Sequence, residues 1–446
     1  MSSPQKRVYM KTFGCQMNER DSSAMQVMLQ NRGFGVAVHP EEADLILFNT
    51  CTIRDKAYQK AMSDIGRARV HKHRPGVMIG ICGCAAQQAK EQLLKRFHHI
   101  DFVMGPDQIF RLPMLLEEIE AGKRSSATDL IDDPGTYVFV DGITETDIHR
   151  GTAFVTIMKG CNYSCAYCIV PQVRGKEVNR DPSDILDEVK SLVCRGVKEV
   201  TLLGQNVADY KGLSASYRLS HLVRVLEEQT GIQRIRFTSP HPRDIDDTLI
   251  EAYAEVKSLC RHIHLPVQAG NNRVLKIMRR GYTREHYLQL IEKLRRCSPH
   301  LAITTDIIVG FPSETKEEFE ETLQLVEAVQ FDQIYAFSYS PRPGTFAQKN
   351  LSDDVLLSEK QERLSRLLEM QRRITREKNE RCVGTTQDIL VTHYDEESAH
   401  HCSGRSSDNR LVHFTGTAAM MGNIVNVRIV RALGNSLEGE LYDNLQ

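Results

Sequence analysis

The sequence predicts an α/β protein in three parts: an N-terminal parallel α/β sheet domain, a central partial (β/α)6 barrel and a small C-terminal all-β barrel. Short apolar runs alternate with helical patterns to about residue 124, and six more strand and helix repeats follow from residue 151. The last segment alternates apolar and polar residues in short runs. We place the domains at residues 6–124, 151–380 and 381–446, with a linker at 125–150.

Composition bounds the class of protein. The 57 Lys and Arg residues nearly balance the 58 Asp and Glu residues, so any nucleic acid must be met by local patches. The chain has twelve cysteines, no signal peptide and no apolar run of membrane-spanning length. These features predict a cytoplasmic protein with no membrane partner, whose thiols are available for metal.

Three N-terminal strands each end beside a cysteine. The strands are predicted at residues 7–13, 43–49 and 77–81, and Cys15, Cys51 and Cys84 follow them. Parallel strands present their carboxyl ends at one edge of a sheet, so the three thiols are expected to converge there. This pattern alone fits a metal site or three core thiols.

A contiguous cysteine motif opens the central domain. An apolar strand at residues 153–158 leads into C-x3-C-x2-C, formed by Cys161, Cys165 and Cys168. A structural zinc site needs four ligands, and the sequence holds no second C-x2-C pair. Three thiolates suit a 4Fe-4S cluster with one iron open to a small molecule. The spacing, the preceding strand and Tyr167 disfavour three ordinary buried cysteines.

The rest of the central domain repeats strand and helix. Strands are predicted at residues 200–203, 235–238, 263–265, 303–309 and 334–337, and helices at 182–195, 219–229, 244–256, 284–296 and 316–329. Barrels of parallel strands carry their chemistry in the loops at the carboxyl ends of the strands. The Gly and Pro residues of these loops also fit simple tight turns.

Charged residues near the same face have two interpretations. Asp306 lies inside an apolar strand, where a carboxylate is costly unless paired, so it binds either a substrate group or a basic partner. Arg174, Arg279 and Arg280 lie in basic turns. They are either solvated surface or candidates for phosphate contact with an RNA.

A long amphipathic helix at residues 355–381 is predicted to pack on the barrel. After it, strands are predicted at residues 387–392, 411–414 and 423–432. This segment is net acidic, so any RNA must be held by a few arginines, with Arg405 and Arg410 as candidates.

The C-x3-C-x2-C motif, with an aromatic residue before its third cysteine, resembles the radical S-adenosylmethionine (radical SAM) superfamily. The resemblance implies that Cys161, Cys165 and Cys168 hold a 4Fe-4S cluster whose open iron chelates the cofactor, which is cleaved to a 5′-deoxyadenosyl radical. Tyr167 would lie beside the adenine. The other cofactor contacts implied by the strand-end loops are Gly204, Gln205, Ser239, Gln268 and Gly310.

The N-terminal cysteine motifs resemble the methylthiotransferase branch of this superfamily. They read T-F-G-C-Q-M-N at 12–18, N-T-C-T-I-R at 49–54 and G-C-A-A-Q at 83–87. The resemblance implies that Cys15, Cys51 and Cys84 hold an auxiliary 4Fe-4S cluster. Cys82 falls on the strand and is predicted to be a core thiol.

The run at 404–414 resembles a TRAM domain, an RNA-binding β-barrel, and the segments 154–171, 273–278 and 340–345 resemble the tRNA-directed methylthiotransferases. The implied reaction places a methylthio group on C2 of N6-isopentenyladenosine beside the anticodon. One S-adenosylmethionine methylates sulfur on the auxiliary cluster and another supplies the radical. The implied partners are the modified anticodon stem-loop and a one-electron donor such as flavodoxin or ferredoxin, with the protein acting as a monomer.

Two other functions stay open. A sister enzyme would act on threonylcarbamoyl-adenosine in tRNA or on an aspartate of a ribosomal protein, but the motif at 49–54 favours the isopentenyl branch. A non-catalytic RNA-binding iron-sulfur sensor is the alternative from another class, and the intact radical motif argues against it.

Overall fold

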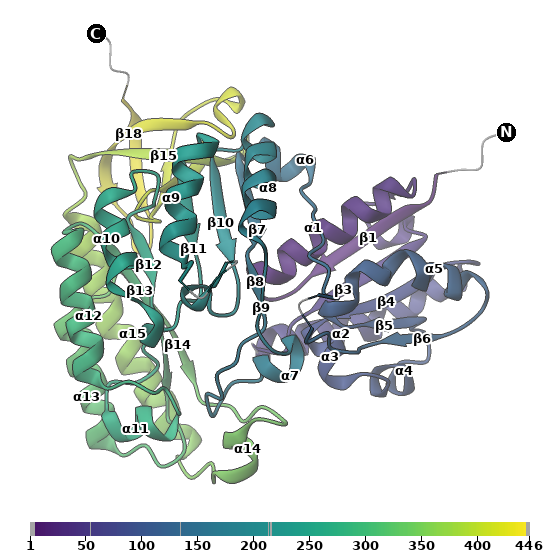
Figure 1. The fold of residues 1–446 in the computed structure, drawn as a ribbon, viewed down its shortest axis with the longest axis horizontal. Helices are drawn as coiled ribbons and strands as arrows, with labels where there is room; N and C mark the ends of the chain where they lie inside the picture. Colours follow the sequence, from purple (N-terminus) through teal and green to yellow (C-terminus); the bar gives the residue numbers. More distant parts are fainter. Residues whose placement is uncertain (1–4, 54, 134, 213, 215, 443–446) are drawn as a thin grey trace. The chain divides into compact units, whose positions relative to one another are not determined.

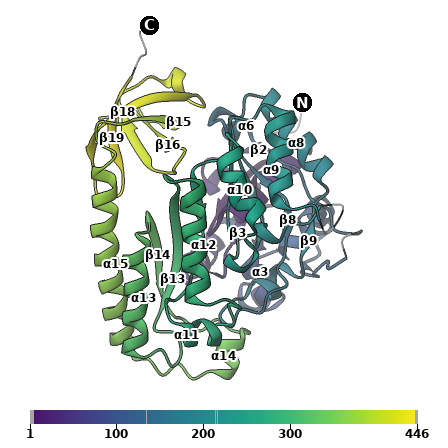
Figure 2. The same cartoon turned by 60° about the vertical axis from the view of Figure 1, so that its left-hand side comes forward.

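The computed structural model describes residues 5–53, 55–133, 135–212, 214 and 216–442, so Arg54 of the second cysteine motif lies outside the described residues. The chain forms two compact units (Figures 1 and 2). The first contains the residues up to 144 together with 158–163 and 169–179. The second contains residues 145–157, 164–168 and the chain from 180 onward.

The first unit is built on a six-stranded parallel sheet with the order β2-β1-β3-β4-β5-β6 (Figure 1). Its strands are β1 (Arg7–Thr12), β2 (Gly35–Val36), β3 (Leu45–Thr50), β4 (Met78–Gly83), β5 (Phe102–Met104) and β6 (Ser125–Ala127). The three strands predicted from the apolar runs are β1, β3 and β4. The parallel sheet is therefore confirmed, and these three strands are direct neighbours.

Helices cover both faces of this sheet. They are α1 (Gln16–Asn31), α2 (Asp55–Arg67), α3 (Cys84–Ala89), α4 (Gln92–Arg96) and α5 (Leu112–Glu120), whereas α7 (Val170–Arg174) of the same unit packs on α3. Successive β3 side chains point to opposite faces, so Ile46 packs with α2 and α4 while Leu45 packs with α1 and α5. Burial on both faces explains why the strands are continuous apolar runs.

A two-stranded ribbon also belongs to the first unit. The predicted strand at 153–158 divides after Thr156, and β8 (Met158–Lys159) pairs antiparallel with β9 (Val178–Asn179). Lys159 is fully buried, and its ammonium lies 2.8 Å from the Asp107 carboxylate. This long-range ion pair is invisible to local sequence patterns.

The second unit begins with the six strands of the predicted open barrel. They are β7 (Thr152–Thr156), β10 (Glu199–Leu203), β11 (Arg234–Phe237), β12 (His262–His264), β13 (Ala302–Val309) and β14 (Gln333–Ser338). They form two parallel three-stranded sheets, β7-β10-β11 and β12-β13-β14. Within the described residues, a single bridge from Ile235 to Leu259 continues the pairing beyond β11.

Helices alternate with these strands, as predicted. Their bounds are α6 (Glu145–His149), α8 (Pro182–Cys194), α9 (Leu219–Thr230), α10 (Asp247–Glu255), α11 (Asn272–Ile277), α12 (Arg284–Cys297), α13 (Lys316–Val329), α14 (Phe346–Asn350) and α15 (Leu357–Glu380). The long helix α15 lies beside α13 and β14 (Figure 2). Its buried stripe mixes apolar Leu367 and Ile374 with polar Arg363 and Gln371.

The chain ends in a closed five-stranded barrel with the order β15-β16-β17-β19-β18. Its strands are β15 (Thr386–Tyr394), β16 (Cys402–Ser406), β17 (Leu411–Phe414), β18 (Ile424–Ala432) and β19 (Leu437–Leu441). The predicted all-β domain is confirmed, although β16 and β19 are too polar to be recognised singly. Among the described residues, no helix is long and apolar enough to cross a membrane.

Candidate metal centres

Three cysteines lie at one edge of the N-terminal sheet. Cys15 is the third residue after β1, Cys51 directly follows β3, and Cys84 is the first residue of α3. Burial raises the pKa of the Cys15 thiol, and the neighbouring Cys51 raises it further. The topology therefore brings the three thiols to adjacent strand ends, as expected, while their role as ligands stays a prediction.

Buried amides hold these cysteine loops together. Asn18 donates from Nδ2 to the Phe13 carbonyl at 2.9 Å and to the Thr50 carbonyl at 3.0 Å. Asn49 donates to the Asn18 carbonyl at 2.8 Å, and the Thr50 hydroxyl donates to the Cys82 carbonyl at 2.6 Å. All three side chains are fully buried. The network fixes the three strand ends relative to one another.

Two glycines let the cysteine loops approach closely. Gly14 has a φ of +112°, and a Cβ there would lie 2.3 Å from Cys51 Cβ. Gly83 has a φ of +89°, and a Cβ there would lie 2.4 Å from Asn49 Oδ1. Both positions exclude side chains by conformation and by contact.

Arg174 lies within this N-terminal site. Its Nη2 atom donates to Asp21 Oδ2 at 2.8 Å and to Asn18 Oδ1 at 3.1 Å. Burial raises the pKa of the Cys84 thiol to about 12, while the Arg174 charge and hydrogen bond act in the opposite direction. Arg174 is only 4% exposed, so the structure gives its guanidinium partners other than the predicted RNA phosphate.

The helix that carries Arg174 also packs on this site. Cys84 forms a buried apolar cluster with Ile169 and with Val173 of α7. Cys82 instead lies in the sheet core, where burial raises its pKa to about 12. This environment agrees with the prediction that Cys82 is a core thiol.

The contiguous cysteine motif is divided between the two units. In the first unit, the Cys161 amide donates to the Gly175 carbonyl at 3.2 Å. In the second unit, the Cys168 amide donates to the Cys165 carbonyl at 3.0 Å, and the Ala166 amide donates to the Met278 carbonyl at 2.9 Å. Backbone hydrogen bonds thus hold the loop on both sides.

Arg280 contacts Cys165 within the second unit. Its Nη1 atom donates to Cys165 Sγ at 3.4 Å, Nη2 donates to the Pro266 carbonyl at 2.9 Å, and Nε donates to the Tyr282 hydroxyl at 3.1 Å. Arg280 is 5% exposed. Like Arg174, it is shielded from solvent and has partners other than the predicted RNA.

Several predicted cofactor residues adopt unusual backbone conformations. Ser239 has a φ of +60°, Gln268 of +75° and Gly310 of +66°, and they follow β11, β12 and β13. A residue other than glycine in this region costs about 1–3 kcal/mol, and such strain concentrates at functional sites. Gly204 and Gln205 follow β10. The Tyr167 and Phe311 rings form a T-shaped pair with centroids 6.5 Å apart.

Asn206 is a residue of this face that the sequence did not single out. It is buried, donates to Asp244 Oδ2 at 2.7 Å and accepts from the His241 amide at 2.9 Å. It therefore joins the loops that follow β10 and β11. The signal was its place directly after Gly204 and Gln205.

The remaining residues predicted to contact substrate or RNA differ in their exposure to solvent. Asp306 is partly buried and lies 3.5 Å from His264 Nε2, so its basic partner is a histidine. Arg279 is exposed, with its guanidinium 3.4 Å above the Phe346 ring. Arg405 is exposed, whereas Arg410 is bound to Asp332 at 2.6 Å and to Asp408 at 2.8 Å.

The described residues contain no group of three His, Cys, Asp or Glu side chains gathered tightly enough for one metal ion. In a 4Fe-4S cube each thiolate binds a different iron, so its ligands stand further apart than those of a single ion. The N-terminal donor set is wholly sulfur, which suits iron-sulfur chemistry. The chemistry of this donor set therefore fits the predicted iron-sulfur cluster.

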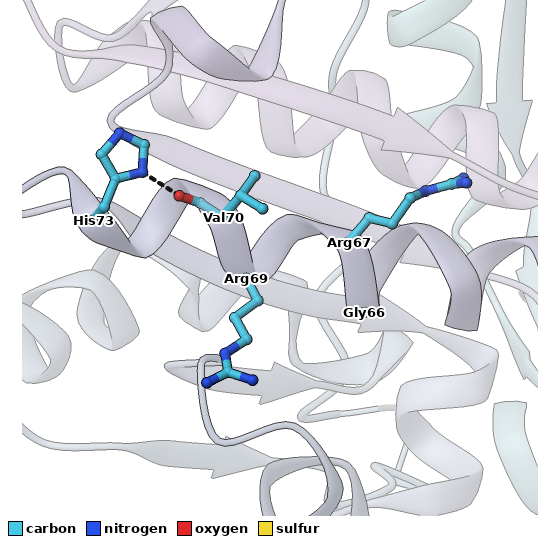
Figure 3. A pocket seen from close by; sticks show the side chains of 5 residues that line it. All are labelled: Gly66, Arg67, Arg69, Val70 and His73. Atoms are coloured by element: carbon cyan, nitrogen blue, oxygen red, sulfur yellow. Dashed lines mark hydrogen bonds between the residues drawn. The ribbon is translucent and has the colours of Figure 1, made fainter.

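A pocket on the first unit lies elsewhere (Figure 3). It is lined by Gly66 and Arg67 of α2 and by Arg69, Val70 and His73 of the following 3-10 helix. That segment leads into the amino end of β4, whereas the cysteines follow the carboxyl ends of their strands. The pocket therefore lies at the amino ends of the strands, at the end of the sheet opposite the cysteines.

Comparisons with known proteins match all three parts of the chain. The Radical SAM superfamily matches residues 155–326, the Uncharacterized protein family UPF0004 matches 7–105 and the TRAM domain matches 380–442. The tRNA-2-methylthio-N(6)-dimethylallyladenosine synthase of Alkalilimnicola ehrlichii is 45% identical, covering 98% of this chain and 97% of that protein. The protein of the same name from Geotalea uraniireducens is 44% identical, covering 98% and 99%.

Solved structures resemble the fold at low identity. The radical S-adenosylmethionine methyltransferase TsrM from Kitasatospora setae is 15% identical with a TM-score of 0.56, covering 86% of this chain and 78% of that one. The cobalamin-dependent S-adenosylmethionine radical enzyme OxsB is 11% identical with a TM-score of 0.53, covering 81% and 56%. At these identities the likeness supports the fold alone.

Proposed function

Since the chain belongs to the tRNA-2-methylthio-N6-dimethylallyladenosine synthase family, we propose that it places a methylthio group on C2 of N6-isopentenyladenosine beside the tRNA anticodon. The observation that carries this proposal is the 45% identity to a synthase over 98% of the chain. The radical SAM and TRAM matches support the same chemistry and the same kind of substrate. The C2–H bond is unactivated, so acid–base catalysis by side chains cannot break it and a radical is required.

Membership of the radical SAM superfamily implies S-adenosylmethionine and a 4Fe-4S cluster. We propose that Cys161, Cys165 and Cys168 hold this cluster and that Cys15, Cys51 and Cys84 hold a second. When bound, the first supplies the electron that cleaves S-adenosylmethionine and the second carries the sulfur that is methylated and transferred. The all-sulfur donor sets support both assignments.

Other residues of the chain are proposed to position the cysteine loops and to bind the cofactor. Asn18 and Asn49 hold the N-terminal cysteine loops in register through buried hydrogen bonds. Cofactor contacts are proposed at the strand-end loops of the barrel, where Ser239 and Gln268 keep strained backbone conformations. The residues proposed to contact the cofactor are Tyr167, Gly204, Gln205, Ser239, Gln268 and Gly310.

The RNA contacts are proposed to come from exposed cations. Arg279 and Arg405 are exposed and can reach phosphates, whereas Arg410 is held by two carboxylates. Asp306 stays a candidate for a substrate group beside His264. We further propose that an external one-electron donor of the flavodoxin or ferredoxin class reduces the enzyme. The enzyme is proposed to act as a monomer.

The test is anaerobic incubation of the reconstituted protein with S-adenosylmethionine, a strong one-electron reductant and three anticodon stem-loops: unmodified, isopentenylated and threonylcarbamoylated. Mass analysis of the nucleosides should show the 2-methylthio product from the isopentenylated RNA alone. Product from the threonylcarbamoylated RNA would identify the sister activity instead. Absence of 5′-deoxyadenosine in every reaction would favour the non-catalytic sensor.

A further inference from the structure

Each cysteine trio has one buried arginine beside it that is not a ligand. Arg174 is 4% exposed and donates at 3.1 Å to Asn18 Oδ1, which also accepts from Cys15 Sγ at 4.0 Å; its neighbour Val173 packs on Cys84. Arg280 is 5% exposed and donates to Cys165 Sγ at 3.4 Å. A guanidinium stays charged at every accessible pH, so burying one is costly unless an anion faces it. Arg174 has such an anion in Asp21, whereas the potentially anionic group bonded to Arg280 is the Cys165 sulfur.

We infer that Arg174 and Arg280 are positioning residues that each hold one ligand cysteine and offset the negative charge of the cluster bound by that trio. This inference rests on the proposed two-cluster function. Charge near an iron-sulfur cluster and hydrogen bonds to its sulfurs set its reduction potential. A nearby cation stabilises the reduced form, because reduction adds one negative charge.

The partners of Arg280 give the stronger half of the argument. Among the described residues, its hydrogen-bond partners besides Cys165 are two neutral groups, the Pro266 carbonyl and the Tyr282 hydroxyl, and its guanidinium also lies over the Tyr282 ring. Within the described part of the chain, its hydrogen bonds go to Cys165, Pro266 and Tyr282, and none of them goes to a carboxylate. Of these partners, Cys165 is the one proposed as a metal ligand, and its sulfur would be a thiolate when it binds metal. The charge of Arg280 is thus available for a cluster.

Arg174 differs from Arg280 because it forms an ion pair with a carboxylate. Asp21 Oδ2 accepts from its Nη2 atom at 2.8 Å, and Asn18 Oδ1 accepts at 3.1 Å. Asn18 Oδ1 also accepts from Cys15 Sγ at 4.0 Å, so these bonds hold the guanidinium beside the N-terminal cysteine loops. Arg174 and Asp21 should therefore act on the N-terminal cluster with opposite signs.

The experiment is a redox titration of the full-length reconstituted protein without S-adenosylmethionine, followed by electron paramagnetic resonance. The clusters are told apart with the Cys161→Ala/Cys165→Ala/Cys168→Ala and the Cys15→Ala/Cys51→Ala/Cys84→Ala backgrounds. Arg280→Gln should shift the reduction equilibrium of the radical SAM cluster about tenfold toward the oxidised form, a potential lower by about 59 mV. Arg174→Gln should do the same to the auxiliary cluster alone, and Asp21→Asn should raise that potential.

Unchanged potentials with normal iron and sulfide content would overturn the inference, as would a shift of the same sign for Arg174→Gln and Asp21→Asn. If a Gln variant takes up no iron, the matched Lys variant tests the inference instead. Lysine keeps the positive charge but lacks the forked hydrogen-bond donors of the guanidinium. Iron retained by Arg280→Lys or Arg174→Lys supports charge compensation, and iron lost overturns it. Wild-type protein that takes up no iron and sulfide would overturn the proposed function, and this inference with it.

Discussion

The two cysteine trios are built in opposite ways. Cys161, Cys165 and Cys168 lie within one short loop, held by backbone hydrogen bonds at Cys161 and Cys168. Cys15, Cys51 and Cys84 come from three separate strand ends, and only the order β1-β3-β4 makes them neighbours. The first trio depends on local spacing and the second on the packing of a whole domain. Substitutions should therefore affect the two sites independently.

The largest effect should come from removing one ligand of each trio. Cys165→Ala should reduce cleavage of S-adenosylmethionine to background and abolish product. Cys51→Ala should spare cleavage and abolish methylthiolation, because its cysteine belongs to the other proposed cluster. Chromatography of 5′-deoxyadenosine and of the tRNA nucleosides measures both. Equal loss of cleavage in a folded Cys51→Ala protein would break the division between the sites.

Gly14→Ala should remove the N-terminal cluster while sparing the contiguous motif. The added Cβ would lie 2.3 Å from Cys51 Cβ, in a backbone conformation at a φ of +112°. Gly33→Ala is the matched control, since Gly33 has a φ of +83° and no atom within 4 Å of an added Cβ. The overpacking should cost Gly14→Ala about 1–3 kcal/mol more than the control, measured by denaturant unfolding. Equal costs would show that the close approach to Cys51 is unimportant.

Asn18→Ala should weaken the N-terminal cysteine site without introducing a steric clash. It leaves the buried Phe13 and Thr50 carbonyls without their donor, at about 1–3 kcal/mol for each group. Iron content should fall toward that of one cluster, while cleavage of S-adenosylmethionine persists. Asn31→Ala, at the exposed end of the same helix, should change neither quantity. Loss of cleavage in Asn18→Ala would link the two sites more tightly than we expect.

The smallest effect should follow Cys82→Ala. Cys82 lies in the sheet core, so its loss should cost about 1 kcal/mol of stability, a typical value for a point substitution. Iron and sulfide content should match the wild type, whereas Cys84→Ala should lose one cluster. Elemental analysis of both variants decides which thiol is the ligand. Iron lost from Cys82→Ala and kept by Cys84→Ala would reverse the assignment.

Periodicity and spacing predicted most of the fold. The apolar runs around Leu45 and Ile79 become β3 and β4, and the pattern at 316–329 becomes α13 (Lys316–Val329). Short polar strands such as β16 were missed, because their residues carry no apolar alternation. Local patterns also failed at Lys159, whose burial depends on Asp107 far away in the chain.

The sequence by itself determined the six cysteines, the strands that carry them and the family they resemble, because these depend on residue type and local spacing. Only the tertiary structure decided the environments of the arginines. Arg174 and Arg280 lie in basic turns of the sequence, yet both are buried, Arg280 against Cys165 and Arg174 beside the cysteine loops through Asn18, while Arg279 and Arg405 remain exposed. The local sequence around a charged side chain looks the same whether that side chain is buried or exposed. Its environment is set by contacts between distant segments, such as Arg174 with Asp21 and Arg280 with Pro266.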